Sequence, residues 1–156
     1  CQAVKIEGGE FRAPTIAALV QNGVPVLGHV GLTPQSVKVL GHRVQGRGDE
    51  AARQLVADAR AVADAGAFAV VLEAVPAALG AQVSAAVPIP VIGIGAGPGC
   101  DGQILVINDV LGLSGDFHPK FVKVYADLGK QISAAAAAYQ ADVAGGAFPG
   151  PEHCYE

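Results

Sequence analysis

Short, continuously apolar segments constrain the fold of this chain more than any other feature of the sequence. They are rich in β-branched residues and lie at residues 3–6, 24–27, 68–72, 90–94 and 104–107. Most of them do not alternate between apolar and polar residues, which is typical of strands that are buried on both faces. Because parallel sheets are covered on both faces, the segments predict about five parallel strands.

Helical patterns lie between and after the predicted strands. We expect one helix from Pro14 to Gln21 and a second from Asp49, as its cap, to Ala65, with Gly66 as its stop. A third helix is expected from Pro76 to just before Pro88. A fourth is indicated by an apolar stripe that stops at Gly145-Gly146 and consists of Ile132, Ala135, Tyr139 and Val143. In the second helix Leu55, Ala59 and Val62 share one face. Strands that alternate with helices indicate right-handed βαβ units.

Two architectures of the α/β class fit this pattern. One is a (β/α)8 TIM barrel, which needs roughly 250 residues, so that a chain of 156 residues would supply about the last five strands. The other is an open doubly wound sheet, which would explain the length but not the polar strand ends described below. We predict the barrel, with residues 1–156 as the C-terminal part of a single barrel domain and residues 129–156 as its C-terminal helix and tail. Since the sequence starts with Cys1 and contains no Met, we expect it to be part of a longer polypeptide.

Composition excludes several classes of function. The chain is 51% hydrophobic and 15% charged, which is a globular composition. A net charge of −4 without basic runs argues against binding to nucleic acid or an anionic membrane. No apolar stretch is long enough to span a membrane, and no signal peptide is visible. The three cysteines have no CxxC spacing, so we expect free thiols in a reducing cytosol and a cytoplasmic protein.

The first predicted strand ends in charged residues, at the end where parallel β/α folds carry their chemistry. Lys5 and Glu7 are two residues apart, so they point to the same face of a strand. Gly8 and Gly9 follow at once, which suits close approach of the backbone to a ligand. We interpret the pair as facing the lumen of a barrel; a paired core Lys and Glu, or an exposed first strand, is the alternative.

Two further strand ends carry ionisable residues. His29 lies between glycines after the second strand, where it is either part of a site or a hydrogen-bonded structural residue. Glu73 ends the third apolar run, just before Val75-Pro76. Burial raises the pKa of a glutamate, and a base tuned towards neutrality is what abstraction of a proton beside a carbonyl needs. The alternative is a carboxylate that favours the start of the next helix.

Two loops could also belong to a site. Gly93-x-Gly95-x-Gly97 fits a dinucleotide fingerprint, a barrel phosphate site or a place where a ligand lies against the backbone, and we favour the last. The stretch from Leu32 to Gly48 is too long for a simple βα loop. Thr33-Pro34 indicates a helix start within it, and basic residues lie among glycines at 41–48. We interpret the stretch as a mobile active-site flap; a solvated loop or a subunit contact is the alternative.

Several long motifs resemble the ketopantoate hydroxymethyltransferase family. They are Val4-Lys5-Ile6-Glu7-Gly8-Gly9-Glu10, Gly28-His29-Val30-Gly31-Leu32-Thr33-Pro34-Gln35-Ser36, Val44-Gln45-Gly46-Arg47-Gly48-Asp49, Leu72-Glu73-Ala74-Val75-Pro76, Val91-Ile92-Gly93-Ile94-Gly95-Ala96-Gly97, Cys100-Asp101-Gly102-Gln103 and the tail residues Phe148-Pro149 and Glu152-His153. The resemblance covers essentially the whole chain. It implies a (β/α)8 barrel that assembles into homo-oligomeric decamers, and an enzyme of pantothenate synthesis.

The resemblance also implies a reaction and a set of site residues. The family transfers a hydroxymethyl group from 5,10-methylenetetrahydrofolate to 3-methyl-2-oxobutanoate, giving 2-dehydropantoate, with Mg²⁺ bound by the keto acid and stabilising an enolate. By this resemblance Glu73 is the general base, Lys5 contacts the keto acid, His29 lines the same pocket and Glu7 is a metal ligand. The partners expected are small molecules, with neither nucleic acid nor membrane among them.

The sequence departs from the family pattern in one respect. The other two metal carboxylates of the family are aspartates on early strands that this sequence does not contain, so only Glu7 of the metal set is present. Two other readings stay open at this point. One is an enzyme like phosphoenolpyruvate mutase or isocitrate lyase, which also use metal-bound enolates on β/α barrels. The other is an inactive barrel fragment that serves only in assembly.

Overall fold

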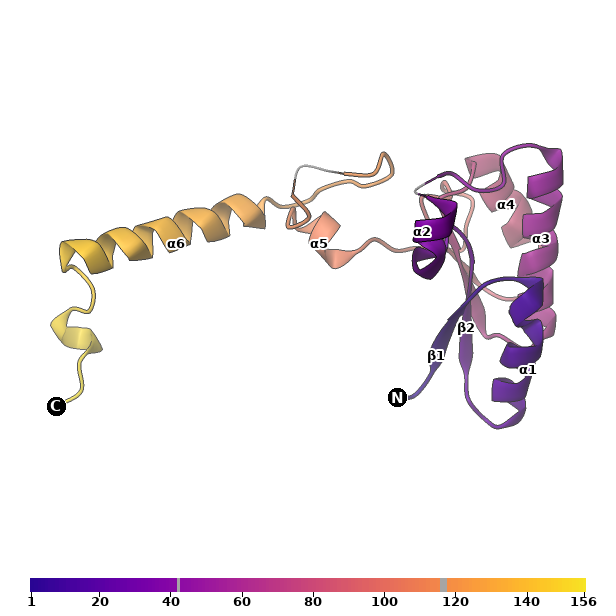
Figure 1. Cartoon of the computed structure of the whole chain (residues 1–156), viewed down its shortest axis with the longest axis horizontal. Coiled ribbons are helices and arrows are strands. Elements are labelled where there is room, and N and C mark those ends of the chain that lie inside the picture. The colour runs from indigo at the N-terminus through magenta and orange to yellow at the C-terminus, as the bar shows by residue number, and fades with distance from the viewer. Residues whose placement is uncertain (42, 116–117) are drawn as a thin grey trace. The chain divides into compact units, whose positions relative to one another are not determined.

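The computed structural model describes residues 1–41, 43–115 and 118–156. The chain forms two compact units, Cys1–Ile104 and Leu105–Glu156, and each is described by itself below. Figure 1 shows the elements of both units along the chain. The first unit contains the whole sheet and all four residues that the sequence singles out as a site.

The first unit is built on a parallel sheet of five strands. In chain order these are β1 (Val4–Glu7), β2 (Val26–Gly31), β3 (Ala69–Glu73), β4 (Val91–Ile94) and β5 (Gly102–Gln103). Each strand pairs in parallel with the next, so the order in the sheet is β1-β2-β3-β4-β5. All the carboxyl ends of the strands therefore meet at one edge of the sheet.

The helices connect successive strands. The elements are η1 (Glu10–Arg12), α1 (Ala13–Gln21), η2 (Pro34–Ser36), α2 (Val37–Leu40), α3 (Asp49–Asp64) and α4 (Ala77–Ala86). The three longer helices, α1, α3 and α4, lie on the same side of the sheet (Figure 1). A doubly wound sheet would reverse its strand order and carry helices on both faces. Sequential strands with helices on one side are the arrangement found in a β/α barrel, so the predicted α/β class is confirmed.

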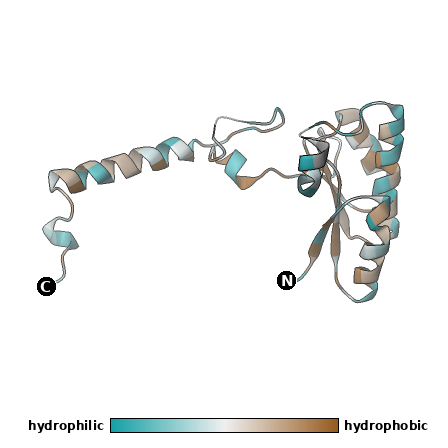
Figure 2. Cartoon of the chain, viewed as in Figure 1, coloured by the Kyte–Doolittle hydropathy of each residue, from teal (hydrophilic) through white to brown (hydrophobic). Residues whose placement is uncertain are grey.

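The core of this unit lies between the sheet and the long helices. Its buried side chains come from both layers and include Ile16, Val26, Val30, Leu55, Ala59, Val62, Val70, Leu72, Leu79, Val83 and Val91. Figure 2 shows the strands mainly in the brown of hydrophobic residues, whereas α3 carries much teal. The strand residues of the core share one face of the sheet, which leaves the opposite face for other side chains.

The helix α3 was predicted correctly in its extent and in its buried face. Leu55, Ala59 and Val62 are all buried, and Gly66 follows the helix with a φ of 95°, as a stop requires. The prediction that Asp49 caps the helix is wrong, because Gly48 is the N-cap and Asp49 is the first helical residue. In the first turn of α3 the Asp49 carboxylate interacts favourably with the positive end of the helix dipole, without a capping hydrogen bond.

The last predicted strand is also wrong. The fifth strand is only Gly102–Gln103, and the apolar segment 104–107 leads into the helix α5 (Ile107–Val110). The N–H groups of Val110 and Leu111 donate to the carbonyls of Val106 and Ile107, at 3.1 and 3.0 Å. A short apolar run fits a strand or a helix equally well, and here the following residues close a helical turn.

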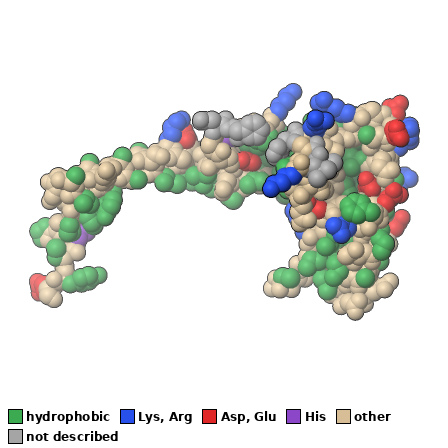
Figure 3. Space-filling model, viewed as in Figure 1, with side chains coloured by type: hydrophobic (Ala, Val, Ile, Leu, Met, Phe, Trp, Pro, Cys, Tyr) green, Lys and Arg blue, Asp and Glu red, His purple; other side chains and the backbone are tan. Residues whose placement is uncertain are grey.

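The second unit consists of α5, α6 (Leu128–Gly145) and the short helix η3 (Pro151–His153). Asp127 caps α6 by accepting a hydrogen bond from the Lys130 N–H, and the hydrogen bond from the Lys130 ammonium lowers the pKa of this carboxyl. Gly146 ends the helix in the left-handed conformation, as predicted. Ile132, Tyr139 and Val143 are exposed, and Figure 3 shows apolar side chains in green along this helix. None of the helices in the described ranges is both long and apolar enough to cross a bilayer.

We predict that Leu72→Ala lowers the free energy of unfolding by about 2–5 kcal/mol, because it leaves a cavity beneath β3. The Leu72 side chain is fully buried between the sheet and the helices. Val44→Ala is the control, since Val44 is 41% exposed and its truncation should change stability by less than about 0.5 kcal/mol. Urea unfolding followed by circular dichroism measures both variants, and equal losses would contradict the core assigned here.

Candidate functional site

The register of the strands places the four predicted site residues on one face of the sheet. Glu7 pairs with His29, and His29 pairs with Val71, two residues before Glu73. Lys5 lies two residues before Glu7 on β1. Because side chains alternate along a strand, all four project from the face opposite the helix-covered core.

The side chains form a continuous row at the carboxyl ends of β1, β2 and β3. The Lys5 Nζ lies 3.8 Å from the Glu7 Oε1, which is also 3.8 Å from the His29 Nδ1. On the other side of the imidazole, the His29 Nε2 lies 3.2 Å from the Glu73 Oε2. His29 is only 1% exposed, and neither ring nitrogen has an aligned hydrogen-bond partner among the described residues. Two carboxylates thus flank a buried imidazole that is free to form further hydrogen bonds.

The carboxylate of Glu7 is held from two directions. Its Oε2 accepts a hydrogen bond of 3.0 Å from the backbone N–H of Gln35 in η2. Its Oε1 faces Lys5 and His29, and its side chain is 8% exposed. Thr33-Pro34 starts η2, as the sequence predicts, and this turn brings the Gln35 N–H to Glu7. The segment after β2 therefore helps to fix the position of Glu7 at the end of β1.

The chain is similar to known proteins along nearly its whole length. A family model described as ketopantoate hydroxymethyltransferase matches residues 1–151. The chain belongs to this family. Several relatives are named 3-methyl-2-oxobutanoate hydroxymethyltransferase. The one from Paracoccus denitrificans is 60% identical over 99% of this chain and 56% of the relative. The one from Streptomyces coelicolor is 61% identical over 97% of this chain and 52% of the relative. A third, from Syntrophotalea carbinolica, is 56% identical over 99% of this chain and 58% of the relative.

Membership of the ketopantoate hydroxymethyltransferase family confirms the resemblance seen in the sequence. The chain spans about half the length of the curated relatives that it matches. The relatives are transferases by name, and five sequential parallel strands agree with part of a larger barrel.

A backbone feature next to Glu73 was not predicted from the sequence. Ala74 has a φ of 52°, which is rare for a residue with a side chain. Its carbonyl accepts a hydrogen bond of 2.8 Å from the N–H of Gln45, and the Glu73 carbonyl accepts one of 2.9 Å from Leu32. Both ends of the predicted flap are thus tied to Glu73 and its neighbour. Residue 42 lies outside the described residues, and the mobility of the flap stays a prediction.

The glycine-rich turn after β4 packs against the start of α4. Gly95 and Gly97 have φ values of 65° and 78°, and a Cβ on Gly97 would collide with Ala77. The side-chain amide of Gln103 donates a hydrogen bond of 2.9 Å to the Gly97 carbonyl. No helix opens at Gly97, since turns lead from there directly to β5, and a dinucleotide fingerprint requires one. Close packing alone accounts for these glycines, and contact with a ligand stays a prediction.

A magnesium ion would find part of a ligand set here. Within residues 1–41, 43–115 and 118–156, no group of three or more His, Cys, Asp or Glu side chains could hold a metal ion. Mg²⁺ commonly takes one or two carboxylates from the protein and completes its octahedron with water and substrate oxygens. The carboxylate of Glu7 suits one such position, because it is fixed by Gln35 and lies at a strand end.

We predict that Gly31→Ala destabilises the protein far more than Gly23→Ala does. Both glycines have a positive φ, of 90° and 78°, which costs an alanine about 1–2 kcal/mol. A Cβ on Gly31 would also collide with the backbone carbonyl of Glu73, whereas the space around Gly23 is open. Thermal unfolding of both variants should show roughly 2 kcal/mol or more of additional loss for Gly31→Ala. Similar losses of stability in the two variants would mean that the close contact between Gly31 and the Glu73 carbonyl is absent.

Proposed function

We propose that this chain is the part of a hydroxymethyltransferase that carries the general base, and that the whole enzyme converts 3-methyl-2-oxobutanoate to 2-dehydropantoate. The donor of the one-carbon unit would be 5,10-methylenetetrahydrofolate, with water supplying the hydroxyl oxygen. The observation that supports this function is the row Lys5, Glu7, His29 and Glu73 on one face of three adjacent strand ends. The names of the relatives support the transferase activity.

The reaction needs a carbanion at the carbon beside a ketone. A positioned base accelerates removal of such a proton by about 10²–10⁴-fold, which is too little by itself. The electrons of the broken C–H bond move towards the keto oxygen, where positive charge must stabilise them. The site therefore has to combine a base with a cationic side near the keto acid.

Glu73 is the residue that we assign as base. Its side chain is 15% exposed, so it is largely removed from water yet reachable by a substrate on the lumen side. The imidazole of His29 at 3.2 Å restricts where the carboxylate points. The bonds from Leu32 and Gln45 to the backbone at Glu73 and Ala74 fix the strand end that carries it. A base held in this way can reach a proton in one geometry only.

Lys5 and Glu7 form the other side of the proposed site. Lys5 is 47% exposed in its side chain, so its ammonium is free to reach the carboxylate of a keto acid. Glu7 would provide one ligand of Mg²⁺, together with oxygens of the substrate. When bound, Mg²⁺ supplies positive charge beside the developing negative charge of the keto acid. We propose further that the whole protein is a cytoplasmic homo-oligomer.

We predict that Glu73→Gln abolishes most turnover but leaves binding of 3-methyl-2-oxobutanoate nearly unchanged. The amide keeps the size of the side chain but cannot accept a proton, so kcat should fall by about 10²–10⁴-fold. Product formation by the full-length protein, with binding followed by calorimetry, measures both quantities. Glu50→Gln, an exposed change in the first turn of α3, is the matched control and should keep full turnover.

Two outcomes would overturn this assignment. Near-normal turnover in Glu73→Gln would exclude Glu73 as the base. If the wild-type protein formed product from the keto acid without folate, the reaction would resemble that of a phosphoenolpyruvate mutase or isocitrate lyase instead.

We predict that Glu7→Gln weakens Mg²⁺ binding by about tenfold or more, measured by calorimetry in the presence of the keto acid. A neutral amide is a poorer ligand for this hard cation than a carboxylate. The same Glu50→Gln variant is the control. Unchanged Mg²⁺ affinity in Glu7→Gln would remove Glu7 from the metal site while leaving the role of Glu73 intact.

A further inference from the structure

The residue that follows the proposed base has a strained backbone. Among the described residues, Ala74 is the only one other than glycine with a positive φ, and its value is 52°. In this left-handed conformation the Cβ crowds the backbone, so the conformation persists only where the surrounding structure holds it. Strained residues of this kind cluster at functional sites.

The left-handed turn at Ala74 changes the face of the sheet towards which the next side chain points. In a continuous strand, residues 73 and 75 would project from the same face. Val75 is instead 4% exposed and belongs to the hydrophobic core with Leu72 and Leu79. Glu73 is thus the last side chain of β3 on the site face, and the apolar side chain of Val75 is kept away from its carboxylate.

The peptide group on the N-terminal side of the Ala74 Cα is held by two hydrogen bonds. The Glu73 carbonyl accepts one of 2.9 Å from the N–H of Leu32, and the Ala74 N–H donates one of 2.9 Å to the carbonyl of Ile94. Leu32 directly follows β2, and Ile94 is the last residue of β4. The carboxyl ends of both strands next to β3 therefore fix this peptide group.

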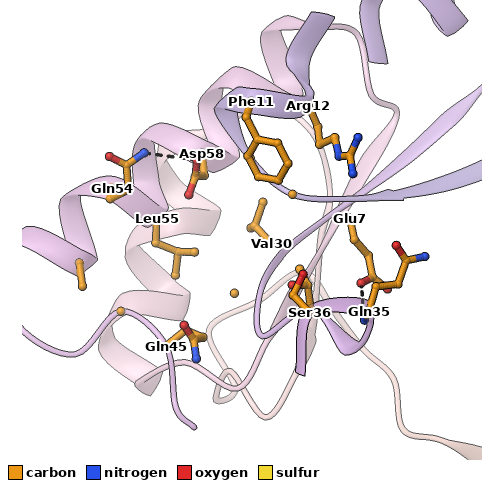
Figure 4. A pocket seen from close by; sticks show the side chains of 16 residues that line it. Glu7, Phe11, Arg12, Val30, Gln35, Ser36, Gln45, Gln54, Leu55 and Asp58 are labelled. Carbon is orange, nitrogen blue, oxygen red and sulfur yellow. Dashed lines mark hydrogen bonds between the residues drawn. The ribbon is translucent and has the colours of Figure 1, made fainter. Parts of the chain in front are cut away.

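The peptide group on the C-terminal side of the Ala74 Cα is held in the same way. The Ala74 carbonyl accepts a hydrogen bond of 2.8 Å from the N–H of Gln45, and the Val75 N–H donates one of 3.1 Å to the carbonyl of Gly95. Gln45 also lines the pocket beside Glu7, which Figure 4 shows from close by. Because φ and ψ describe how two peptide groups are turned about their shared Cα, the four bonds together set the conformation of Ala74.

We propose that the left-handed backbone of Ala74 positions the Glu73 carboxylate for proton abstraction, so that Ala74 is a positioning residue of the reaction. The inference rests on the proposed function, in which Glu73 is the base. The hydrogen bonds orient the strand end, and the His29 Nε2 meets the carboxylate there, 3.2 Å from the Glu73 Oε2. The reaction requires the conformation of residue 74 rather than the methyl group of alanine.

Substitutions that differ in their tolerance of a positive φ test this role in the full-length protein. Glycine adopts the left-handed conformation without strain, so the conservative variant Ala74→Gly should keep kcat within about twofold. Valine is branched at Cβ and strongly disfavours a positive φ, so Ala74→Val should displace the strand end and lower kcat by about tenfold or more. The KM for 3-methyl-2-oxobutanoate should stay within about threefold in both variants, because Lys5 and Glu7 lie on β1.

Hydrogen exchange at C3 of the keto acid measures the action of the base alone. In D₂O, Glu73 takes the C3 proton, exchanges it for a deuteron of the solvent and returns the deuteron to the same carbon. Followed by NMR in the presence of Mg²⁺, this exchange should slow in Ala74→Val by about the factor that kcat loses. It should be retained in Ala74→Gly.

Thermal unfolding separates positioning from folding. Ala74→Gly removes both a buried methyl group and the strain, so its Tm should stay within about 2 °C of the wild type. Ala67 is the matched control position, because it is 3% exposed, precedes β3 and has no positive φ. Ala67→Gly should lower the Tm by about 2–4 °C, and Ala67→Val should overpack the core, but both should keep kcat. Equal losses of Tm in the two glycine variants would contradict the strain at Ala74.

A second variant keeps the test decisive if Ala74→Val does not fold. Glu73→Asp retains a carboxylate but withdraws it by one methylene group. A strand end that is fixed cannot follow, so kcat should fall by about tenfold or more. A kcat near that of the wild type would mean that the backbone adapts, and would overturn the positioning role.

The outcomes distinguish this inference from the proposed function. If Ala74→Val lowers the Tm but keeps kcat and hydrogen exchange, while Glu73→Gln loses turnover, the turn serves only to connect β3 to α4 and the proposed function stands. If Glu73→Gln keeps its turnover, both the proposed base and the role of Ala74 are wrong.

Discussion

The parallel register of β1, β2 and β3 is the constraint on which the rest of this unit depends. It pairs Glu7 with His29 and sets Glu73 two residues beyond the partner of His29. A shift of one residue in either pairing would turn one of these side chains to the other face. The same register directs Val26, Val30, Val70 and Leu72 into the core beneath the helices. Burial of the apolar face thus determines the position of the polar face, and the site follows from the packing of the core.

Burying ionisable groups is costly, and the structure offsets this cost by grouping them. His29 is almost fully buried, but carboxylates lie on both sides of its ring, and an ammonium group lies beyond one of them. Ionisable groups that contact one another are far cheaper to bury than one isolated charge. Because neither ring nitrogen of His29 has an aligned hydrogen bond within the described ranges, the imidazole can still bond to a substrate or to water.

The sequence predicted four of the five strands and the long helices, because each of these has a local signal. It also singled out Lys5, Glu7, His29 and Glu73, which the register places on one face of the sheet, and their roles stay predictions. Continuous apolar runs marked β2, β3 and β4, and an ionisable residue at a strand end stands out against an apolar background. Ala74 carries no such signal, since its positive φ results from tertiary hydrogen bonds of Gln45 and of Ile94 with its backbone. The strand predicted at 104–107 failed because an apolar run of four residues does not distinguish a strand from a helix entry.

A pocket beside Glu7, lined in part by Phe11, Arg12 and Asp58, could not have been predicted from the sequence either. Phe11 and Arg12 follow two glycines and look like ordinary loop residues, and Asp58 lies on a helix almost fifty residues away. They meet because Gly9 allows Asp58 to lie directly against the end of β1, where a Cβ would collide with its carboxylate. The pocket therefore depends on the tertiary contact between η1 and α3, which no local sequence pattern predicts.

The sheet ends at β1 in the part of the chain that the structure describes. Within the described residues β1 pairs with β2 alone, so its other edge has backbone groups without a strand partner. A closed barrel of eight strands leaves no such edge. Strands that closed the barrel against β1 would place their own carboxyl ends beside Glu7, because all strands of such a barrel run parallel. We expect any further carboxylate ligands of a Mg²⁺ site to come from such strand ends, because these would lie next to Glu7.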